Sequence, residues 1–259
     1  MTILDQILAT KREEVAERKR KISARDLGVT PFAKRERLSM RKALENSSVG
    51  IIAEFKRKSP SKGYFCKDAI VSEIIEGYTL NGASACSVLT DSEYFGGSLL
   101  DLALARKITN VPLLRKDFII DEYQIAEAMS YGADAILLIA AALSVAQCHE
   151  YTDIAHSYGL EVLLEVHTES ELDHLFPEVD MVGVNNRNLA TFKTDIYTSF
   201  ALASKIPVCH LKVSESGIHS METVKALQSA GFRGFLMGER FMKEKQPALA
   251  LKNFVSHAG

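Results

Sequence analysis

The 259 residues are 47% hydrophobic, which is enough apolar surface for a large core in one or two domains. The formal net charge is −2, so no overall basic field indicates a nucleic acid or a membrane as partner. Charged residues occur too early in the chain for a signal peptide, and the longest apolar run, residues 135–143, is far too short to span a bilayer. We therefore expect a soluble, cytoplasmic protein.

Residues 1–48 have the pattern of a charged helical extension. One face is expected to be apolar, and Arg, Lys and Glu are expected to fill the other. The apolar residues at helical spacing are Ile3, Leu4, Ile7, Leu8 and Val15. Pro31 and Ser39 should divide this region into at least two pieces. We expect the extension to pack on a single domain formed by residues 49–259.

From residue 49 onward, short apolar runs alternate with longer amphipathic stretches. The eight runs are 49–55, 83–90, 111–117, 133–140, 160–166, 180–186, 208–215 and 232–238. Helical patterns between them, such as 121–132 and 144–159, end in Gly just before the next run, as helix C-termini often do. Such alternation predicts parallel strands with helical crossovers, and eight units fit an α/β fold of the (β/α)₈ TIM-barrel type. A doubly wound open sheet is the main alternative, although no G-x-G-x-x-G follows the first run.

Polar residues stand at the ends of most of these runs, which is where a barrel carries its chemistry. They are Glu54, Lys56, Arg115, Lys116, Asp117, Glu165, Asn185, Asn186, Arg187, Glu215, Ser216, Gly217, Gly238 and Glu239. Strand side chains two apart share a face, so Lys116 is in phase with Leu114 while Arg115 faces the other way. Glu161 shares a face with Glu165 but lies about 13 Å lower, and we interpret it as structural.

Each of these residues alone could be structural, as a salt-bridge partner, a solvated loop charge, a turn Asn or a helix cap. Together, on one rim of a barrel, they predict an active site. The four cysteines are far apart, without C-x-x-C, and indicate reduced and mostly buried thiols. His167 and His174 are expected on a solvated surface, and no metal site is predicted. The loop that ends at Gly96 and Gly97 is either mobile or tightly turned.

Seven motifs in order give the chain a resemblance to one family. They are "IIAEFKRKSPSKG", "VLTDSEYFGGSLLDL", "PLLRKDFIIDEYQI", "GADAILLI", "LLEVHTESEL", "VGVNNRNL" and "VSESGI". With these motifs the chain resembles the indole-3-glycerol-phosphate synthase family over essentially its whole length. The resemblance implies a (β/α)₈ carboxy-lyase of tryptophan biosynthesis whose N-terminal extension caps the barrel. The implied reaction closes 1-(2-carboxyphenylamino)-1-deoxyribulose 5-phosphate to indole-3-glycerol phosphate, with loss of CO₂ and water and without metal or organic cofactor.

The resemblance also implies a role for each matching residue. Lys116 corresponds to the general acid at the ketone, Glu165 to the acid/base of dehydration, and Glu54 to the carboxylate that orients the lysine. Substrate anion contacts are implied for Lys56 and Ser59, and polar substrate contacts for Asn185, Arg187 and Glu215. Apolar walls are implied for Phe118, Leu137 and Leu189. The phosphate cradle corresponds to Ser216, Gly217, Gly238 and Glu239.

The segment "MGERFM" departs from the family pattern at Arg240 and Phe241, so the helix start and any phosphate contact of Arg240 stay open. A sugar-phosphate isomerase similar to phosphoribosylanthranilate isomerase is an alternative, but it would need a Cys at a strand end, and Cys66 is in a loop. A non-catalytic phosphate-binding barrel is a second alternative. The expected partner is a small phosphorylated substrate, neither nucleic acid nor membrane, and the chain is expected to be a monomer or weak homo-oligomer.

Overall fold

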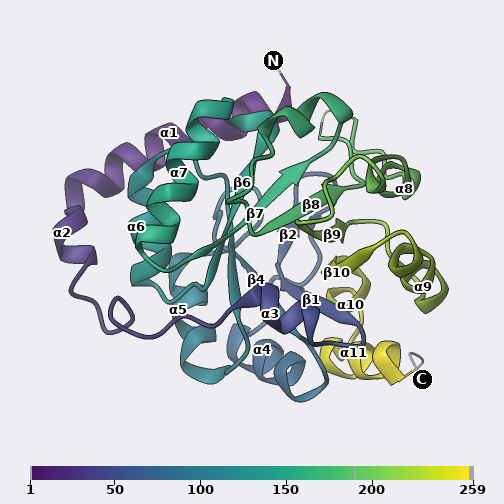
Figure 1. Cartoon of the computed structure of the whole chain (residues 1–259). Coiled ribbons are helices and arrows are strands. Elements are labelled where there is room, and N and C mark those ends of the chain that lie inside the picture. The colour runs from purple at the N-terminus through teal and green to yellow at the C-terminus, as the bar shows by residue number, and fades with distance from the viewer. Residues whose placement is uncertain (1, 190, 257–259) are drawn as a thin grey trace.

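All eight expected strands are present and close into a parallel barrel (Figure 1). The strands are β1(Gly50–Phe55), β4(Ala85–Leu89), β5(Leu113–Lys116), β6(Ala135–Ile139), β7(Glu161–Val166), β8(Met181–Asn185), β9(Leu211–Glu215) and β10(Phe232–Met237). The computed structural model describes residues 2–189 and 191–256. Because β1 pairs with both β4 and β10, the sheet closes on itself. The barrel prediction is confirmed, and the open-sheet alternative is wrong.

Helices surround the barrel. They are α4(Val71–Leu80), α5(Leu99–Ile108), α6(Glu122–Ser130), α7(Val145–Ser157), α8(Tyr197–Ala203), α9(Met221–Ser229), α10(Glu239–Met242) and α11(Pro247–Val255), with 3₁₀ helices η1(Ala140–Ala142) and η2(Glu169–His174). Gly82, Gly132, Gly159 and Gly231 follow α4, α6, α7 and α9 with φ between 71° and 95°, which confirms the Gly stop signals. The crossover after β7 holds η2 in place of an α-helix.

The loop after β1 contains a feature that the strand count missed. A short antiparallel hairpin, β2(Lys58–Ser59) and β3(Gly63–Tyr64), stands outside the barrel sheet. The turn of the hairpin lies in residues 59–63, a stretch that contains Ser, Pro and Gly. Two paired residues a strand are too few for a period-2 pattern to be visible in the sequence.

The core has two layers, and their boundary fixes which side chains reach the site. Ile52, Leu114, Leu163 and Val213 belong to the cluster inside the barrel, whereas their strand neighbours pack outward against the helices. Glu54, Lys116, Glu165 and Glu215 lie two residues further along the same strands. Alternation therefore turns these four polar side chains into the barrel mouth.

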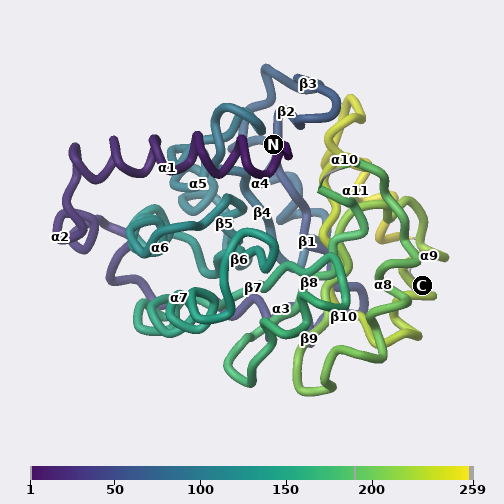
Figure 2. The backbone as a smooth tube through the Cα atoms, turned by 90° about the horizontal axis from the view of Figure 1, so that it is seen from above, coloured from purple at the N-terminus to yellow at the C-terminus, as the bar shows by residue number. Residues whose placement is uncertain are grey.

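Residues 2–48 form α1(Ile3–Lys21), α2(Ala24–Leu27) and α3(Met40–Glu45), and they cover both ends of the barrel. In Figure 2, α1 runs along one side of the barrel. Its residues Ile3, Leu4 and Ile7 line the same cavity as the turn of the β2–β3 hairpin, residues 60–62. At the opposite end, Met40 and Leu44 are fully buried in the inner cluster. The backbone N–H of Arg41 donates to Glu161 (2.9 Å), as does the Ser39 hydroxyl, which confirms Glu161 as a structural residue. The first break in the extension follows Lys21, earlier than Pro31.

Lys11 is one of the charged residues expected opposite the apolar face of the extension, but it does not face solvent. Its side chain is fully buried, and its Nζ lies 2.7 Å from Glu14, 2.8 Å from Asp91 and 3.0 Å from Asp117. Asp91 and Asp117 follow β4 and β5. Helical periodicity cannot reveal these partners, because they come from distant parts of the chain. Burial alone would lower the pKa of Lys11, but Asp117 and Asp91 outweigh it and raise that pKa.

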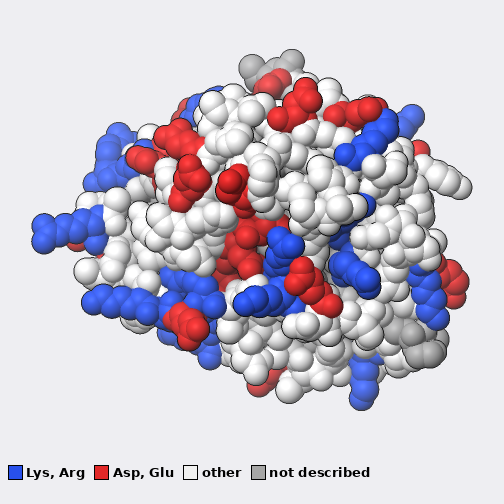
Figure 3. Space-filling model, in the orientation of Figure 1, with Lys and Arg blue, Asp and Glu red and all other residues white. Residues whose placement is uncertain are grey.

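Charges of both signs are interspersed over the face shown in Figure 3, in keeping with the net charge of −2. Among the described residues, no helix has the length and apolar character needed to cross a bilayer. Cys86 and Cys148 are buried, Cys66 is partly buried, and Cys209 is exposed. The cysteines are thus less buried than the sequence suggested.

Candidate active site

A cavity of about 440 Å³ opens at the C-terminal ends of the barrel strands. This volume suits a small-molecule ligand. The expected site residues that line it are Glu54, Lys56, Lys116, Phe118, Leu137, Glu165, Asn185, Arg187, Leu189, Glu215, Ser216, Gly217, Gly238 and Glu239. Ser59 is not among the lining residues and is buried in β2, whereas Ser61 lines the cavity. The cavity therefore brings together residues from α1 and from all eight barrel strands.

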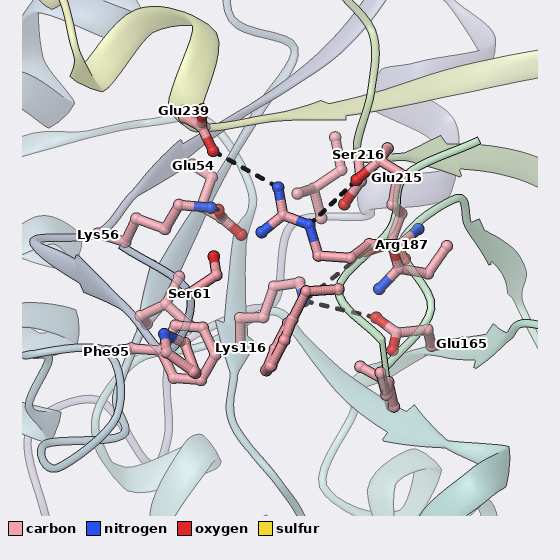
Figure 4. Close-up of a pocket in the computed structure, with 18 of the residues that line it drawn as sticks. Glu54, Lys56, Ser61, Phe95, Lys116, Glu165, Arg187, Glu215, Ser216 and Glu239 are labelled. Atoms are coloured by element: carbon pink, nitrogen blue, oxygen red, sulfur yellow. Dashed lines mark hydrogen bonds and ion pairs between the residues drawn. The ribbon is translucent and has the colours of Figure 1, made fainter. Parts of the chain in front are cut away.

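Lys116 stands at the centre of the charged groups (Figure 4). Its Nζ lies 3.5 Å from Glu165 Oε2 and 3.7 Å from Glu215 Oε2. Burial alone would lower the pKa of Lys116, but the nearby carboxylates, led by Glu165, outweigh burial and raise it. At neutral pH the side chain is therefore an ammonium, which is the form that a general acid requires.

The two carboxylates beside Lys116 have different protonation states. Burial opposes ionisation of Glu165, yet Lys116 and then His167 hold its pKa well below the usual range. Burial raises the pKa of Glu215 to about 8, and repulsion from Glu165 adds to that rise. At neutral pH Glu165 is therefore ionised and Glu215 mostly carries a proton. Pairs of groups whose pKa values are pushed apart in this way are suited to separate acid and base roles.

Glu54 has a different partner from the one we expected. Its Oε1 lies 2.5 Å from Lys56 Nζ, so its ion pair is with Lys56 and not with Lys116. Two glycines make room for the buried carboxylates. A Cβ on Gly238 would lie 2.4 Å from Glu54 Oε1, and a Cβ on Gly183 would lie 2.2 Å from Glu215 Oε1. Gly238 thus has a packing role in addition to the cradle role implied by the resemblance.

The loop after β9 forms one end of the cavity. Ser216 and Gly217 have φ of 65° and 74°, the left-handed conformation that favours Gly. Asn186 is buried, and its amide donates to the backbone oxygens of Glu215 (2.9 Å) and Ser216 (3.0 Å). Asn186 therefore holds this loop in place, while its neighbour Asn185 lines the cavity.

Opposite charges meet across the rim beside this loop. Arg187, after β8, places an Nη 3.5 Å from Glu239 Oε2, and Lys62 from the hairpin loop pairs with Glu239 Oε1. Figure 4 shows Arg187 reaching toward Glu239. These contacts put two cations at the mouth within reach of an anionic ligand.

The other end of the cavity is apolar. Phe118, Leu137 and Leu189 line the cavity, and its apolar lining also contains residues that the sequence analysis missed, namely Ile3, Leu4, Ile7 and Phe95. Phe95 packs against Phe118 with ring centroids 6.2 Å apart. The loop that carries Phe95 is tightly turned, because a Cβ on Gly97 would lie 2.0 Å from the Leu89 carbonyl oxygen. The signal that pointed to this loop was its pair of glycines.

His167 corrects the expectation that it lies on a solvated surface. Its side chain is 9% exposed and lies between Glu165 and Glu171, so it is not on a solvated surface. His174 is also partly buried, and its Nε2 lies 3.0 Å from the Leu143 oxygen. Apart from the two-residue spacing of Glu165 and His167, no sequence pattern indicated these partners.

Arg240 and Phe241, the two residues that depart from the family pattern, have different roles. Phe241 is fully buried, with its ring edge against Tyr78 (6.1 Å) and Phe254 (5.8 Å). Arg240 lines the cavity and pairs with Glu244 at 3.3 Å. Within the residues that the structure describes, no three His, Cys, Asp or Glu side chains form a group that could hold a metal ion.

A model of the indole-3-glycerol phosphate synthase family matches residues 4–254 of this chain. The chain belongs to the indole-3-glycerol phosphate synthase family. A family member from Bacteroides thetaiotaomicron is 52% identical over 255 residues, covering 98% of this chain and 97% of the relative. Proteins of the same name from Campylobacter jejuni subsp. doylei and Burkholderia vietnamiensis are each 42% identical and cover 96% of this chain and 98% and 97% of the relatives.

Solved structures with lower identity support the fold alone. A thiamine phosphate pyrophosphorylase from Pyrococcus furiosus matches with a TM-score of 0.61 at 13% identity, covering 85% of this chain and 98% of that one. A mutant tryptophan synthase alpha-subunit from Pyrococcus furiosus matches with a TM-score of 0.60 at 16% identity, covering 80% of this chain and 96% of that one. Membership in the synthase family decides against the isomerase-like alternative. In addition, Cys66 does not line the cavity, and its Sγ lies 3.1 Å from the Lys56 oxygen.

Proposed function

We propose that this chain catalyses the carboxy-lyase reaction of its family, the ring closure of 1-(2-carboxyphenylamino)-1-deoxyribulose 5-phosphate to indole-3-glycerol phosphate, CO₂ and water. The observation that carries the proposal is the partly buried Lys116 ammonium between two carboxylates of unlike protonation. It lies in a cavity that is apolar at one end and lined by a left-handed loop and cations at the other. This arrangement matches a substrate with an aromatic ring at one end and a phosphate at the other.

Lys116 serves the first step. When the aromatic carbon attacks the ketone, negative charge develops on the carbonyl oxygen, and the Lys116 ammonium donates its proton there. Positioned proton transfer of this kind contributes about 10²–10⁴-fold in rate. The iminium formed on closure accepts the electron pair released when CO₂ leaves, so decarboxylation needs no further electron sink.

Dehydration needs a base for the ring proton and an acid for the departing hydroxyl. The ionised Glu165 suits the base, and Glu215, with a pKa of about 8, holds a proton that the hydroxyl can take. Glu54 and Lys56 form an ion pair without net charge beside them and supply polar contacts to the substrate.

Orientation comes from the two ends of the cavity. The backbone at Ser216, Gly217 and Glu239 is proposed to cradle the phosphate, at the loops after the last two barrel strands, which is the usual phosphate site of this architecture. Phe118, Leu137 and Leu189 are proposed to enclose the aromatic ring. Fixing both ends holds the reacting carbon against the ketone and can supply several kcal/mol of the barrier reduction.

The test is the appearance of indole fluorescence when the purified protein meets the anthranilate-derived ribulose phosphate. Lys116→Ala and Glu165→Gln should each lower turnover at least about a hundredfold, because each removes a proton-transfer group. Lys107→Ala, on the exposed face of α5, is the matched control and should leave turnover unchanged. Wild-type protein without product formation would support the non-catalytic barrel, and full turnover by Lys116→Ala would refute the assigned mechanism.

A further inference from the structure

His167 lies between two carboxylates directly after β7. Its Nε2 is 3.3 Å from Glu165 Oε1, and its Nδ1 is 3.2 Å from Glu171 Oε2. An ionised carboxylate can only accept hydrogen bonds, so each ring nitrogen faces an acceptor. The Nδ1 contact is a hydrogen bond, whereas Nε2 makes no hydrogen bond and lies at ion-pair distance from Glu165. Two ionised carboxylates this close to the ring favour the imidazolium form.

Glu171 anchors the histidine. Its Oε2 accepts the backbone N–H of His167 at 2.6 Å as well as facing the ring nitrogen. Glu171 belongs to η2, the short 3₁₀ helix in the crossover after β7. The turn that replaces an α-helix in this unit thus fixes both the backbone and the ring of His167.

Glu165 has a cation on each of its two oxygens. Its Oε1 faces His167, and its Oε2 faces Lys116. The two cations differ in their access to the substrate, because Lys116 lines the cavity and His167 does not. Lys116 can therefore give its proton to the substrate, whereas His167 stays behind the carboxylate.

We infer that His167 is a positioning residue that remains an imidazolium throughout turnover, fixes the Glu165 carboxylate and keeps it ionised, with Glu171 as its anchor. The inference rests on the proposed function in so far as Glu165 acts as the base. When Lys116 delivers its proton to the ketone, it becomes a neutral amine, and Glu165 loses one neighbouring positive charge. His167 then supplies the remaining charge that holds Glu165 in the form that dehydration requires.

The surrounding charges support this assignment. Glu165 is faced by Lys116 from β5, Asn185 from β8 and Glu215 from β9, and Glu54 from β1 acts on Lys116. His167 is faced by Glu165 from β7 and by Glu171 from η2. Burial alone would lower the pKa of His167, but these two carboxylates outweigh burial and raise it to about 10. A raised pKa means that the charge is present below that pH and therefore throughout the neutral range.

His167→Gln tests the role in turnover, because it retains an N–H donor but removes the charge. Without the imidazolium, the pKa of Glu165 rises, and each unit by which it exceeds the assay pH removes about tenfold of the ionised base. We expect the acid limb of the kcat–pH profile to move to higher pH by at least about one unit, with KM changing less than about threefold. His167→Lys, which restores a cation, should recover part of kcat at low pH.

Histidine NMR of the unliganded wild-type protein gives a second readout that does not depend on activity. The His167 ring signals, assigned by their loss in His167→Gln, should stay in the imidazolium form from pH 6 to pH 8.5, and they should titrate within this range in Glu171→Gln. His174→Gln, on the same 3₁₀ helix, is the control and should leave both the kinetics and the His167 signals unchanged.

An unshifted acid limb in His167→Gln, or His167 signals that titrate near the ordinary histidine pKa of about 6.5 in the wild type, would overturn the inference. If the wild type forms no product while its His167 stays charged, the proposed function is refuted, whereas the assignment of His167 as an imidazolium between two carboxylates is retained. If His167→Gln does not fold, the NMR titration of the wild type and of Glu171→Gln still decides.

Discussion

Replacing Lys11 by Met should destabilise the protein strongly while preserving the length of the side chain. Lys11 is fully buried and faces Asp91 and Asp117. Without the ammonium, Asp117 keeps Arg115 at 3.0 Å, whereas Asp91 keeps the backbone N–H of Tyr94 at 2.7 Å. Removing one partner of a buried ion pair costs about 3–5 kcal/mol. Because Asp117 retains a cation, we expect a loss near 3 kcal/mol, or a Tm lower by roughly 6–12 °C.

The loss of stability in Lys11→Met should depend on pH in a defined direction. Burial already raises the pKa of Asp91 despite Lys11, and removal of the ammonium raises it further. A carboxyl whose folded pKa is raised destabilises the protein as pH rises above its unfolded pKa of about 3.9. The difference in unfolding free energy between wild type and Lys11→Met should therefore be larger at pH 7 than at pH 4.5.

Urea unfolding followed by circular dichroism at both pH values measures this difference. The matched control is Lys19→Met on the same helix, because Lys19 pairs with Asp121 at 2.7 Å with both side chains substantially exposed. That exposed pair should contribute less than about 1 kcal/mol. The reasoning is refuted if Lys11→Met costs no more than Lys19→Met, or if its loss is the same at pH 4.5 as at pH 7.

Three further predictions concern the cavity and its support. For the wild type, kcat/KM should fall as pH rises through about 8, as Glu215 loses its proton, and Glu215→Gln should lack this limb; a limb that persists in the variant contradicts the acid role. Gly238→Ala should lower kcat/KM at least about tenfold, because its Cβ would displace Glu54, and steady-state kinetics with unaltered activity would show that Glu54 need not hold its position. Phe241→Ala should cost about 3–5 kcal/mol in urea unfolding with little change in KM, since its ring fills a buried space between Tyr78 and Phe254; a loss below 1 kcal/mol would contradict that packing role.

The sequence was sufficient for the barrel because local signals repeat eight times. Alternation along each strand also predicted which charges face inward, as Lys116 and Arg115 illustrate. Lys116 lines the cavity, and Arg115 is buried on the outer side against Asp117 and Glu127. These inferences needed only the period of a strand and the rule that barrel chemistry stands at strand C-termini.

What the sequence could not supply are contacts between distant segments. The partner of Glu54 was expected to be Lys116, but side-chain reach makes it Lys56, two residues away. Lys11 was expected only on the charged face of the extension and His167 on a solvated surface, because their carboxylate partners lie across the fold or across a 3₁₀ turn that has no periodic signature. The apolar wall from α1 was missed for the same reason, since helical spacing shows an apolar face without showing what it covers.

The position of residues 1–48 at both ends of the barrel decides which truncations are informative. A deletion of the whole segment would strip Met40 and Leu44 from the barrel floor as well as opening the mouth, so lost activity would have two causes. A deletion that stops at Ile7 removes the wall residues Ile3, Leu4 and Ile7, keeps Leu8 in the inner cluster and spares the buried ion pairs of Lys11 with Asp91 and Asp117. Only the shorter deletion separates the shape of the ligand chamber from the integrity of the scaffold.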